Sequence, residues 1–313
     1  MGHYILNILF TVLLVNCCFG RRIGTRNLCR KGVEGCTNNF PTIDHNSILE
    51  NSLINFQQNI TLRPRILGGR NAKLGESPWL VNLEYRTPKN KLSLLCAGSV
   101  INHRYILTAA HCIRGEIEKF GQLISIRTGE YDLQSEIDCD EKICLDPFQR
   151  FNIAEYKIHP EFYTDKDKRN YNDLAVIKVD RDIMYSNSIS AVAMPTINFP
   201  HLSPGTLLTV SGWGAGYWKG DWNALIPVKQ VVHVPYVTNE KCVLANSVHH
   251  LCAGEYMKDS CYGDSGGPLI RSLNNTQYVV GIVSYGTTCG SEKPAVYTRV
   301  SSFIEWIREN SEI

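Results

Sequence analysis

The sequence has no marked excess of charge of either sign: 32 lysines and arginines stand against 30 aspartates and glutamates in 313 residues. A protein whose main partner is nucleic acid or an anionic membrane surface needs a basic surface, so neither partner is expected here. Beyond the amino terminus there is also no apolar run long enough to cross a bilayer, which takes about 20 residues. Hydrophobic residues nevertheless make up 43% of the chain, enough for a packed core.

The one long apolar run, from Tyr4 to Val15, is shorter than a membrane span and gives way to small and polar residues. Residues 1–20 therefore predict a secretory signal peptide and an extracellular protein; a buried N-terminal helix is the alternative. Secretion suits the twelve cysteines. Once Cys17 and Cys18 leave with the signal, ten remain, an even number appropriate to an oxidising compartment.

Residues 21–65 form a polar, Asn-rich leader without sustained hydrophobic periodicity, so little of it could bury a core of its own. We expect its cysteines, Cys29 and Cys36, to close a small disulfide ring. Two sequons, at Asn59 and Asn274, are candidate glycosylation sites in a secreted chain. The length suggests about two domains, but this leader leaves a single large domain, residues 66–313.

A serine between glycines stands out in the stretch 259–269, which reads DSCYGDSGGPL. Small neighbours let the Ser265 hydroxyl lie exposed at a tight turn, and the backbone N–H groups of Gly263 and Ser265 can point to one spot beside it. That is the arrangement an oxyanion hole requires. By itself the motif would equally fit an ordinary glycine-rich turn.

Two further motifs favour the oxyanion hole over an ordinary turn: TAAHC, which contains His111, and NDLAVI, which contains Asp173. With Ser265 they follow the chain order His, Asp, Ser of the chymotrypsin-type triad. From residue 66 to its end the sequence resembles the trypsin-like serine proteases. The resemblance implies an all-β fold of two six-stranded antiparallel β-barrels with a C-terminal helix.

The hydrophobic pattern agrees with that fold. Residues 93–101 and 278–283 are short apolar, β-branched runs bounded by turn residues, which is typical of strands. Phe303, Ile304, Trp306 and Ile307 recur at helical spacing near the C-terminus and predict a helix whose apolar face packs into the core; a binding site on that face is the alternative.

The resemblance assigns the chemistry residue by residue. Ser265 is the nucleophile, His111 takes and returns its proton, and Asp173 orients and stabilises the imidazole. The amide groups of Gly263 and Ser265 hold the oxyanion. No cofactor is required. Taken singly, His111 or Asp173 could instead be structural.

Substrate preference follows from the same resemblance. Asp259, six residues before Ser265, is expected at the base of the primary pocket, where an acid favours Arg or Lys side chains. Ser284 and Gly286 should line the substrate's path. Ala295 stands where the family usually has glycine, and its methyl group narrows the pocket, which leaves the Arg-to-Lys ratio open.

Arg65 followed by Ile66-Leu-Gly-Gly looks like the activation site of this family, although a basic linker is an alternative. Cleavage after Arg65 would create an α-amino group on Ile66 that pairs with Asp264, directly before the nucleophile. A buried carboxylate without a partner is costly, by about 3–5 kcal/mol, so this pairing can order the pocket. The uncut chain is therefore predicted to be a zymogen.

By resemblance Cys96 pairs with Cys112, Cys242 with Cys252, and Cys261 with Cys289. Cys139 and Cys144 are neighbours in one loop and are most simply joined to each other. Zinc is the alternative, but no second cysteine pair or suitably spaced histidine cluster completes a tetrahedral site. The doublet His249-His250 is expected to be a solvated loop.

The loop that follows Glu130 and Asp132, with its extra cysteine pair, resembles that of arthropod clip-domain serine proteases, which act in extracellular cascades. The match is incomplete, because a clip domain has six cysteines and this leader has two. The cysteine that commonly ties the leader to the protease domain is also absent, so the leader would be released on activation. Acidic oxygens make calcium possible at Glu130 and Asp132; a solvated acidic loop is the alternative.

The predicted function is thus a secreted, zymogen-activated endopeptidase that cleaves after Arg or Lys in an extracellular cascade. Its expected partners are protein substrates such as other zymogens, an activating trypsin-like protease and serpin-type inhibitors. Two alternatives remain: a digestive or venom trypsin, and a non-catalytic protease homologue that serves as a binding cofactor.

Overall fold

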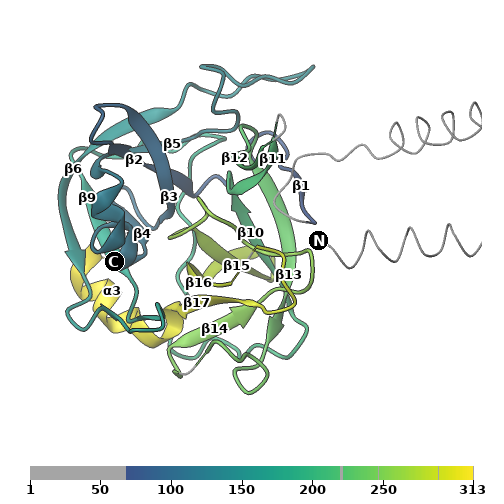
Figure 1. Ribbon diagram of the computed structural model, residues 1–313. Helices are drawn as coiled ribbons and strands as arrows, with labels where there is room; N and C mark the ends of the chain where they lie inside the picture. Colours follow the sequence, from purple (N-terminus) through teal and green to yellow (C-terminus); the bar gives the residue numbers. More distant parts are fainter. Residues whose placement is uncertain (1–67, 219–220, 246, 288, 313) are drawn as a thin grey trace, which may run out of the picture. The chain divides into compact units, whose positions relative to one another are not determined.

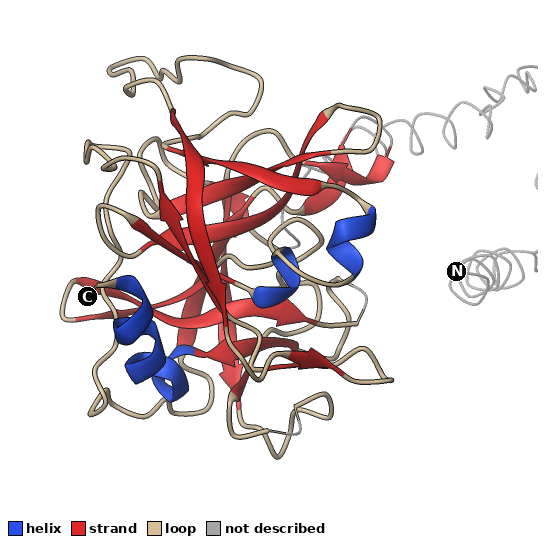
Figure 2. Ribbon diagram, turned by 90° about the vertical axis from the view of Figure 1, so that its left-hand side faces the viewer, coloured by secondary structure: helices blue, strands red, loops and turns tan. Residues whose placement is uncertain are grey.

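The computed structural model describes residues 68–312 apart from 219–220, 246 and 288, and gives only the backbone course of residues 215–225. In this part of the chain strands predominate and the helical segments are short (Figures 1 and 2). No helix among these residues has both the length and the apolar composition to cross a membrane. The proposed signal peptide, and the leader with Cys29, Cys36 and Asn59, lie outside the described residues.

Six antiparallel strands close the first barrel in the order β2, β3, β4, β9, β6, β5. Their bounds are Leu80–Arg86 (β2), Leu92–Val100 (β3), Tyr105–Thr108 (β4), Gln122–Thr128 (β5), Gln149–Ile158 (β6) and Ala175–Val179 (β9). Apolar and β-branched side chains suit a pleated, half-buried surface, and here they fill the barrel interior. Leu83, Ile106, Ile126, Phe151 and Ile177 are among those fully buried there.

The remaining long strands form a sheet in the order β1, β13, β10, β15, β16, β17, β14, in which β14 also pairs with β13. That last pairing closes a second six-stranded barrel, with β1 added at the edge. The bounds are Arg70–Asn71 (β1), Leu207–Gly212 (β10), Gln230–Val237 (β13), His250–Ala253 (β14), Pro268–Leu273 (β15), Thr276–Tyr285 (β16) and Ala295–Arg299 (β17). The predicted pair of six-stranded antiparallel barrels is confirmed.

Shorter elements connect the barrel strands. They are the hairpin of β7 (Tyr163–Thr164) and β8 (Asn170–Tyr171), the hairpin of β11 (Ala215–Trp218) and β12 (Asp221–Leu225), and the 3₁₀ turns η1 (Ala110–Cys112) and η2 (Glu116–Lys119). The β7–β8 hairpin leads directly to Asp173, and η1 carries His111.

The chain ends in the 3₁₀ turn η3 (Val300–Phe303) and the helix α3 (Ile304–Ser311). Phe303, Ile304 and Ile307 are buried in the same core cluster as the first barrel, so the predicted C-terminal helix and its buried face are confirmed. Figure 1 shows α3 beside β9, where Asn102 Nδ2 donates a hydrogen bond to the carbonyl oxygen of Ser311 at the end of the helix.

Four disulfides hold the described part of the chain together: Cys96–Cys112, Cys139–Cys144, Cys242–Cys252 and Cys261–Cys289. The three pairings implied by the resemblance are confirmed. So is the prediction that Cys139 bonds to its loop neighbour Cys144. Since both sulfurs of this pair are used in the bond, they do not form a zinc site.

Candidate active site

The loop before β15 places Ser265 in a turn that only glycine permits. Gly263 and Gly266 both have positive φ, at 97° and 77°. A Cβ on Gly266 would lie 2.3 Å from Thr108 Oγ1 and 2.5 Å from the carbonyl oxygen of Ala97. The turn is therefore pressed against the first barrel, and Ala97 N–H donates to the Ser265 carbonyl at 2.7 Å. Within the described chain, the N–H groups of Gly263 and Ser265 donate to no protein acceptor.

His111 lies in η1, just after β4, where the Cys96–Cys112 disulfide ties the turn to β3. Its Nδ1 is 2.7 Å from Asp173 Oδ2, and its backbone N–H donates to Asp173 Oδ1 at 2.9 Å. Both oxygens of the carboxylate thus face the same histidine, which fixes the ring so that Nε2 points the other way. Neutral His111 then carries its proton on Nδ1 and leaves Nε2 free to accept one.

Asp173 is only 1% exposed. Besides His111, Ser284 Oγ donates to its Oδ2, as does Asn170 Nδ2 at 3.2 Å. Burial alone would raise the pKa of Asp173, but the charge of His111 and these hydrogen bonds outweigh it and hold that pKa below its usual value. For His111, burial alone would lower the pKa, yet the charge of Asp173 and the hydrogen bond with it hold the pKa above its usual value.

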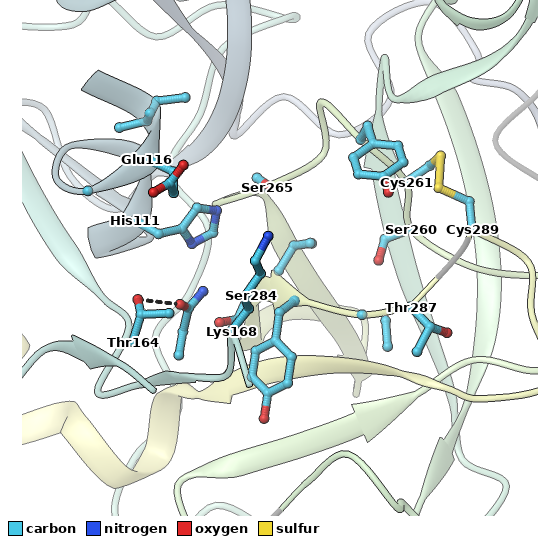
Figure 3. A pocket seen from close by; sticks show the side chains of 18 of the residues that line it. His111, Glu116, Thr164, Lys168, Ser260, Cys261, Ser265, Ser284, Thr287 and Cys289 are labelled. Atoms are coloured by element: carbon cyan, nitrogen blue, oxygen red, sulfur yellow. Dashed lines mark hydrogen bonds between the residues drawn. A yellow bond between two sulfur atoms is a disulfide. The ribbon is translucent and has the colours of Figure 1, made fainter. Parts of the chain in front are cut away.

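His111 and Ser265 line one pocket of about 760 Å³ together with Ser284, and Figure 3 shows the imidazole facing the serine. The Ser265 hydroxyl and His111 Nε2 are not hydrogen-bonded in this structure; Nε2 lies 3.8 Å from Cys112 Sγ. Such a bond often tightens only when substrate is present. The structure therefore brings nucleophile and base to one cleft without joining them.

The same pocket contains the carboxylate of Asp259, which is 6% exposed. Gly290 N–H lies 3.4 Å from its Oδ2, whereas Oδ1 has no hydrogen-bond partner among the described residues. Burial raises the pKa of Asp259 to about 7. A buried carboxylate oxygen left unpartnered inside a cleft is suited to a cationic side chain that enters from solvent.

Ala295 and Gly286 line that pocket as well. A Cβ on Gly286 would lie 3.7 Å from the Ala295 methyl group, in ordinary van der Waals contact with it. The absent side chain of Gly286 therefore keeps the channel open, while the methyl group of Ala295 narrows it from the facing wall. Cys261 and Cys289 form a disulfide that borders the same opening (Figure 3).

Asp264 is fully buried directly beneath the Ser265 turn. Its two oxygens accept hydrogen bonds of 2.9 Å from the N–H groups of Gly214 and Cys261. Gly212 and Gly214 make room for it, because a Cβ on either would lie about 2 Å from a carboxylate oxygen. Burial raises the pKa of Asp264 to about 7, and no cation of the described chain contributes to that value. Arg65 and Ile66 lie outside the described residues.

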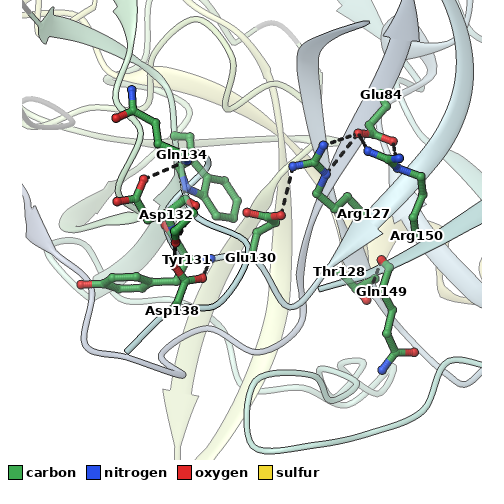
Figure 4. Close-up of polar contacts among 12 residues, drawn as sticks. Glu84, Arg127, Thr128, Glu130, Tyr131, Asp132, Gln134, Asp138, Gln149 and Arg150 are labelled. Atoms are coloured by element: carbon green, nitrogen blue, oxygen red, sulfur yellow. Dashed lines mark hydrogen bonds and ion pairs between the residues drawn. The ribbon is translucent and has the colours of Figure 1, made fainter. Parts of the chain in front are cut away.

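The acidic loop after β5 is anchored by an ion cluster, shown in Figure 4. Glu84, which is fully buried, lies between Arg127 and Arg150, and Arg127 also reaches Glu130 Oε1 at 3.0 Å. Glu130 Oε2 has no partner within the described chain, so one buried carboxylate oxygen remains for a cation. Asp132 Oδ1 accepts the N–H of Gln134, which leaves its other oxygen for a ligand. Among the described residues, however, Glu130 and Asp132 belong to no group of three or more ligating side chains close enough to share one ion, so the calcium site considered from the sequence stays a prediction.

One prediction from the sequence is wrong, and one residue of the site was not predicted. The prediction that His249-His250 is a solvated loop is wrong for His250, which begins β14 and is 2% exposed. Two adjacent histidines carry no periodicity that could have revealed a strand. Asn170 was not predicted as a site residue, because an asparagine three positions before Asp173 has no signature of its own. Asn274 is exposed in the β15–β16 turn, and its glycosylation stays a prediction.

Comparison with known proteins agrees with this geometry. The family model described as Trypsin matches residues 66–307. The CLIP domain-containing serine protease B9 of Anopheles gambiae is 39% identical over 80% of this chain and 64% of its own length. Phenoloxidase-activating enzyme 1 of Spodoptera litura is 37% identical over 79% of this chain and 67% of its own. The CLIP domain-containing serine protease HP8 of Bombyx mori is 36% identical over 88% of this chain and 75% of its own.

The match covers well over half of the sequence and includes both barrels and the cleft between them. The chain therefore belongs to the trypsin family of serine proteases, and arthropod clip-domain proteases are among its relatives. It spans about two thirds of the length of the curated relatives it matches.

Proposed function

We propose that this protein is a secreted serine endopeptidase that hydrolyses peptide bonds after Arg or Lys. One observation carries the proposal: a single pocket holds Ser265 and His111 at its mouth and the unpartnered carboxylate oxygen of Asp259 within it. A basic side chain bound at Asp259 would place the carbonyl carbon that follows it beside Ser265. A charge-assisted hydrogen bond to the buried carboxylate would favour such a side chain over an apolar one.

In the proposed reaction His111 Nε2 accepts the proton of Ser265 as Oγ attacks the carbonyl carbon. The resulting oxyanion receives hydrogen bonds from the free N–H groups of Gly263 and Ser265, each worth about 10²–10³ in rate in related cases. His111 then donates its proton to the leaving amine, and water repeats the sequence to release the acyl group. Asp173, ionised and hydrogen-bonded to Nδ1, stabilises the imidazolium in each half of the cycle.

Activation would follow cleavage between Arg65 and Ile66. The buried carboxylate of Asp264, with a pKa raised to about 7, lacks a cationic partner within the described chain. The new ammonium group of Ile66 would supply that partner and so fix the turn that carries Gly263 and Ser265. The uncut protein is accordingly a zymogen. The leader, residues 21–65, would be released on activation, because the eight cysteines of the described domain pair with one another.

The biological setting we propose is an extracellular proteolytic cascade. Two relatives, from Spodoptera litura and Holotrichia diomphalia, are named for phenoloxidase activation, and others are named as clip-domain proteases. This protein would then have another zymogen as its substrate, a trypsin-like protease as its activator and a serpin-type protein as its inhibitor.

The proposal is tested with purified chain before and after limited trypsin treatment. The new amino terminus is sequenced, and after trypsin is removed with an immobilised inhibitor, p-nitroanilide peptides that end in Arg, Lys or Phe are assayed. We expect a terminus at Ile66, together with turnover of the Arg and Lys peptides that appears only after the cut.

A Ser265→Ala chain treated identically is the matched control, because it can be cut at Arg65 but lacks the nucleophile. Equal activity in this control would assign the turnover to residual trypsin. A correct terminus with no turnover of any peptide would contradict the enzyme and favour the binding cofactor. Cleavage of many unrelated proteins at similar rates would favour a digestive enzyme over a cascade member.

A further inference from the structure

His250 lies behind the cleft and outside the pocket, yet it contacts two residues that line it. It is 2% exposed at the start of β14, on the second barrel. Its Nε2 is 2.9 Å from the backbone carbonyl oxygen of Asn170, and its Nδ1 is 3.3 Å from the Tyr285 hydroxyl. Asn170 and Tyr285 both line the pocket. One buried imidazole therefore bridges two pieces of the cleft wall, one from the β7–β8 hairpin and one from β16 of the second barrel.

The hydrogen bonds assign the form of this histidine. A carbonyl oxygen can only accept, so Nε2 must carry a proton and donate it to Asn170. Burial lowers the pKa of His250, so the ring is neutral and Nδ1 is an acceptor for the Tyr285 hydroxyl, which also has the carbonyl oxygen of Leu244 within reach at 3.1 Å. The bond to Asn170 is thus the stronger of the two links.

The segment that His250 holds also carries Asp173. Thr298 is the cross-strand partner of His250 in β17, so both side chains project from the same face of the sheet. Thr298 Oγ1 donates to the backbone carbonyl of Asp173 at 2.8 Å, while His250 donates to that of Asn170. The second barrel therefore clamps both ends of the segment 170–173. Asp173 also makes hydrogen bonds to His111 and Ser284, whereas the carbonyl group of Asn170 is positioned by its hydrogen bond from His250.

Asn170 also lies close to the reacting groups, since its Nδ2 donates to Asp173 Oδ2. His111, Asn170 and Tyr285 line the same pocket as Asp259, so we expect the residue that precedes a basic side chain bound at Asp259 to lie along these walls. The separation of these two walls then determines how well that preceding side chain packs.

We propose that His250 is a positioning residue that sets this separation and thereby selects the substrate residue that precedes the cleaved Arg or Lys. The proposal rests on the proposed protease function. A glycine at that position makes no side-chain contact with either wall, whereas a leucine contacts both. Loss of the His250 link should therefore weaken cleavage of leucine-containing substrates and leave glycine-containing ones nearly unchanged.

The test compares two amide replacements in the activated full chain. His250→Gln places an N–H donor near the position of Nε2, whereas His250→Asn is one methylene too short to reach the Asn170 carbonyl. Kinetics are measured on Ala-Leu-Arg and Ala-Gly-Arg p-nitroanilides. For His250→Asn we expect KM for the leucine peptide to rise and its kcat/KM to fall by about fivefold, the equivalent of one ordinary hydrogen bond. The glycine peptide should change by less than about twofold, and His250→Gln should restore most of the leucine preference.

His249→Gln is the matched control, because this neighbouring ring contacts Phe303 at 5.1 Å between centroids and does not line the pocket. It should leave the ratio of the two peptides unchanged. Equal losses on both peptides in His250→Asn, or no loss on either, would overturn the proposal and leave His250 a core residue. If the wild-type chain and the His249→Gln control both fail to hydrolyse either peptide, the protease function itself is contradicted.

Discussion

The carboxylate of Asp173 shows how single residues determine the chemistry of this cleft. It receives hydrogen bonds from His111, Asn170 and Ser284, which come from three different parts of the chain. Burial alone would raise the pKa of Asp173, but the charge of His111 and the hydrogen bonds from His111 and Ser284 hold it below its usual value, and the charge of Asp173 in turn raises the pKa of His111. The pKa of His111, the proposed base, is thus raised by Asp173, a residue that does not face the substrate.

This coupling predicts the pH dependence of hydrolysis. Only neutral His111 can accept the proton of Ser265, so kcat/KM should rise with pH and reach half its maximum above 6.5, the ordinary histidine value that Asp173 displaces upward. Asp173→Asn removes the charge and should lower kcat by about 10⁴. The measurement is kcat/KM of an Arg p-nitroanilide from pH 5 to 9. A profile that is flat over this range would exclude His111 as the base.

A second prediction at this scale concerns Ala295. Its methyl group narrows the pocket opposite Gly286, and a guanidinium group is wider than an ammonium group. Ala295→Gly should therefore raise kcat/KM on Arg peptides relative to Lys peptides, by about fivefold if the methyl group costs ~1 kcal/mol. Paired Arg and Lys p-nitroanilides measure the ratio. A ratio that does not change would show that the wall already accommodates the guanidinium group.

Among the elements, the loop after β5 is the place where the sequence predicts a calcium ion. Glu130 keeps one buried carboxylate oxygen without a partner among the described residues, although Arg127 neutralises the other. Millimolar Ca²⁺ should therefore raise the unfolding temperature of the wild-type protein by a few degrees, and Glu130→Gln should lose this shift. Differential scanning fluorimetry with Ca²⁺ and with Mg²⁺ tests it. Equal shifts in protein and variant would place the ion elsewhere.

The elements also show what the sequence could and could not predict. Short β-branched runs and the Phe303–Ile307 periodicity predict strands and a helix, because those signals are local. The closure of the second barrel depends on β14 pairing with both β13 and β17, and a single sequence contains no record of such long-range contacts. For the same reason the motifs named His111, Asp173 and Ser265, whereas Asn170 and His250 became visible only when the barrels were placed together.

At the scale of the whole molecule, the fold encloses one carboxyl group, that of Asp264, whose cationic partner the proposed activation would create. Asp264 is enclosed by Gly212 and Gly214, and two N–H groups bind its oxygens. Its pKa is raised to about 7 by burial, so the folded chain favours the protonated acid. The unfolded chain has an ordinary Asp pKa near 3.8. The contribution of Asp264 to stability is therefore complete below pH 3.8 and is lost as the pH rises through 7.

This linkage gives a prediction that separates the cut from the uncut protein. In the uncut chain, the unfolding free energy should fall between pH 4 and 8 relative to Asp264→Asn, by up to about 4 kcal/mol for a shift of this size. After cleavage at Arg65, the ammonium group of Ile66 should stabilise the ionised form and abolish the fall. Urea unfolding of Ser265→Ala chains, cut and uncut, measures both states without self-digestion. The pocket carboxylate Asp259 also has a raised pKa, mainly because of burial. It is present in all four chains, so its pH dependence cancels in the comparison except for the part that the charge of Asp264 contributes. If the uncut chain and its Asp264→Asn variant lose stability in parallel, Asp264 does not carry the activation switch.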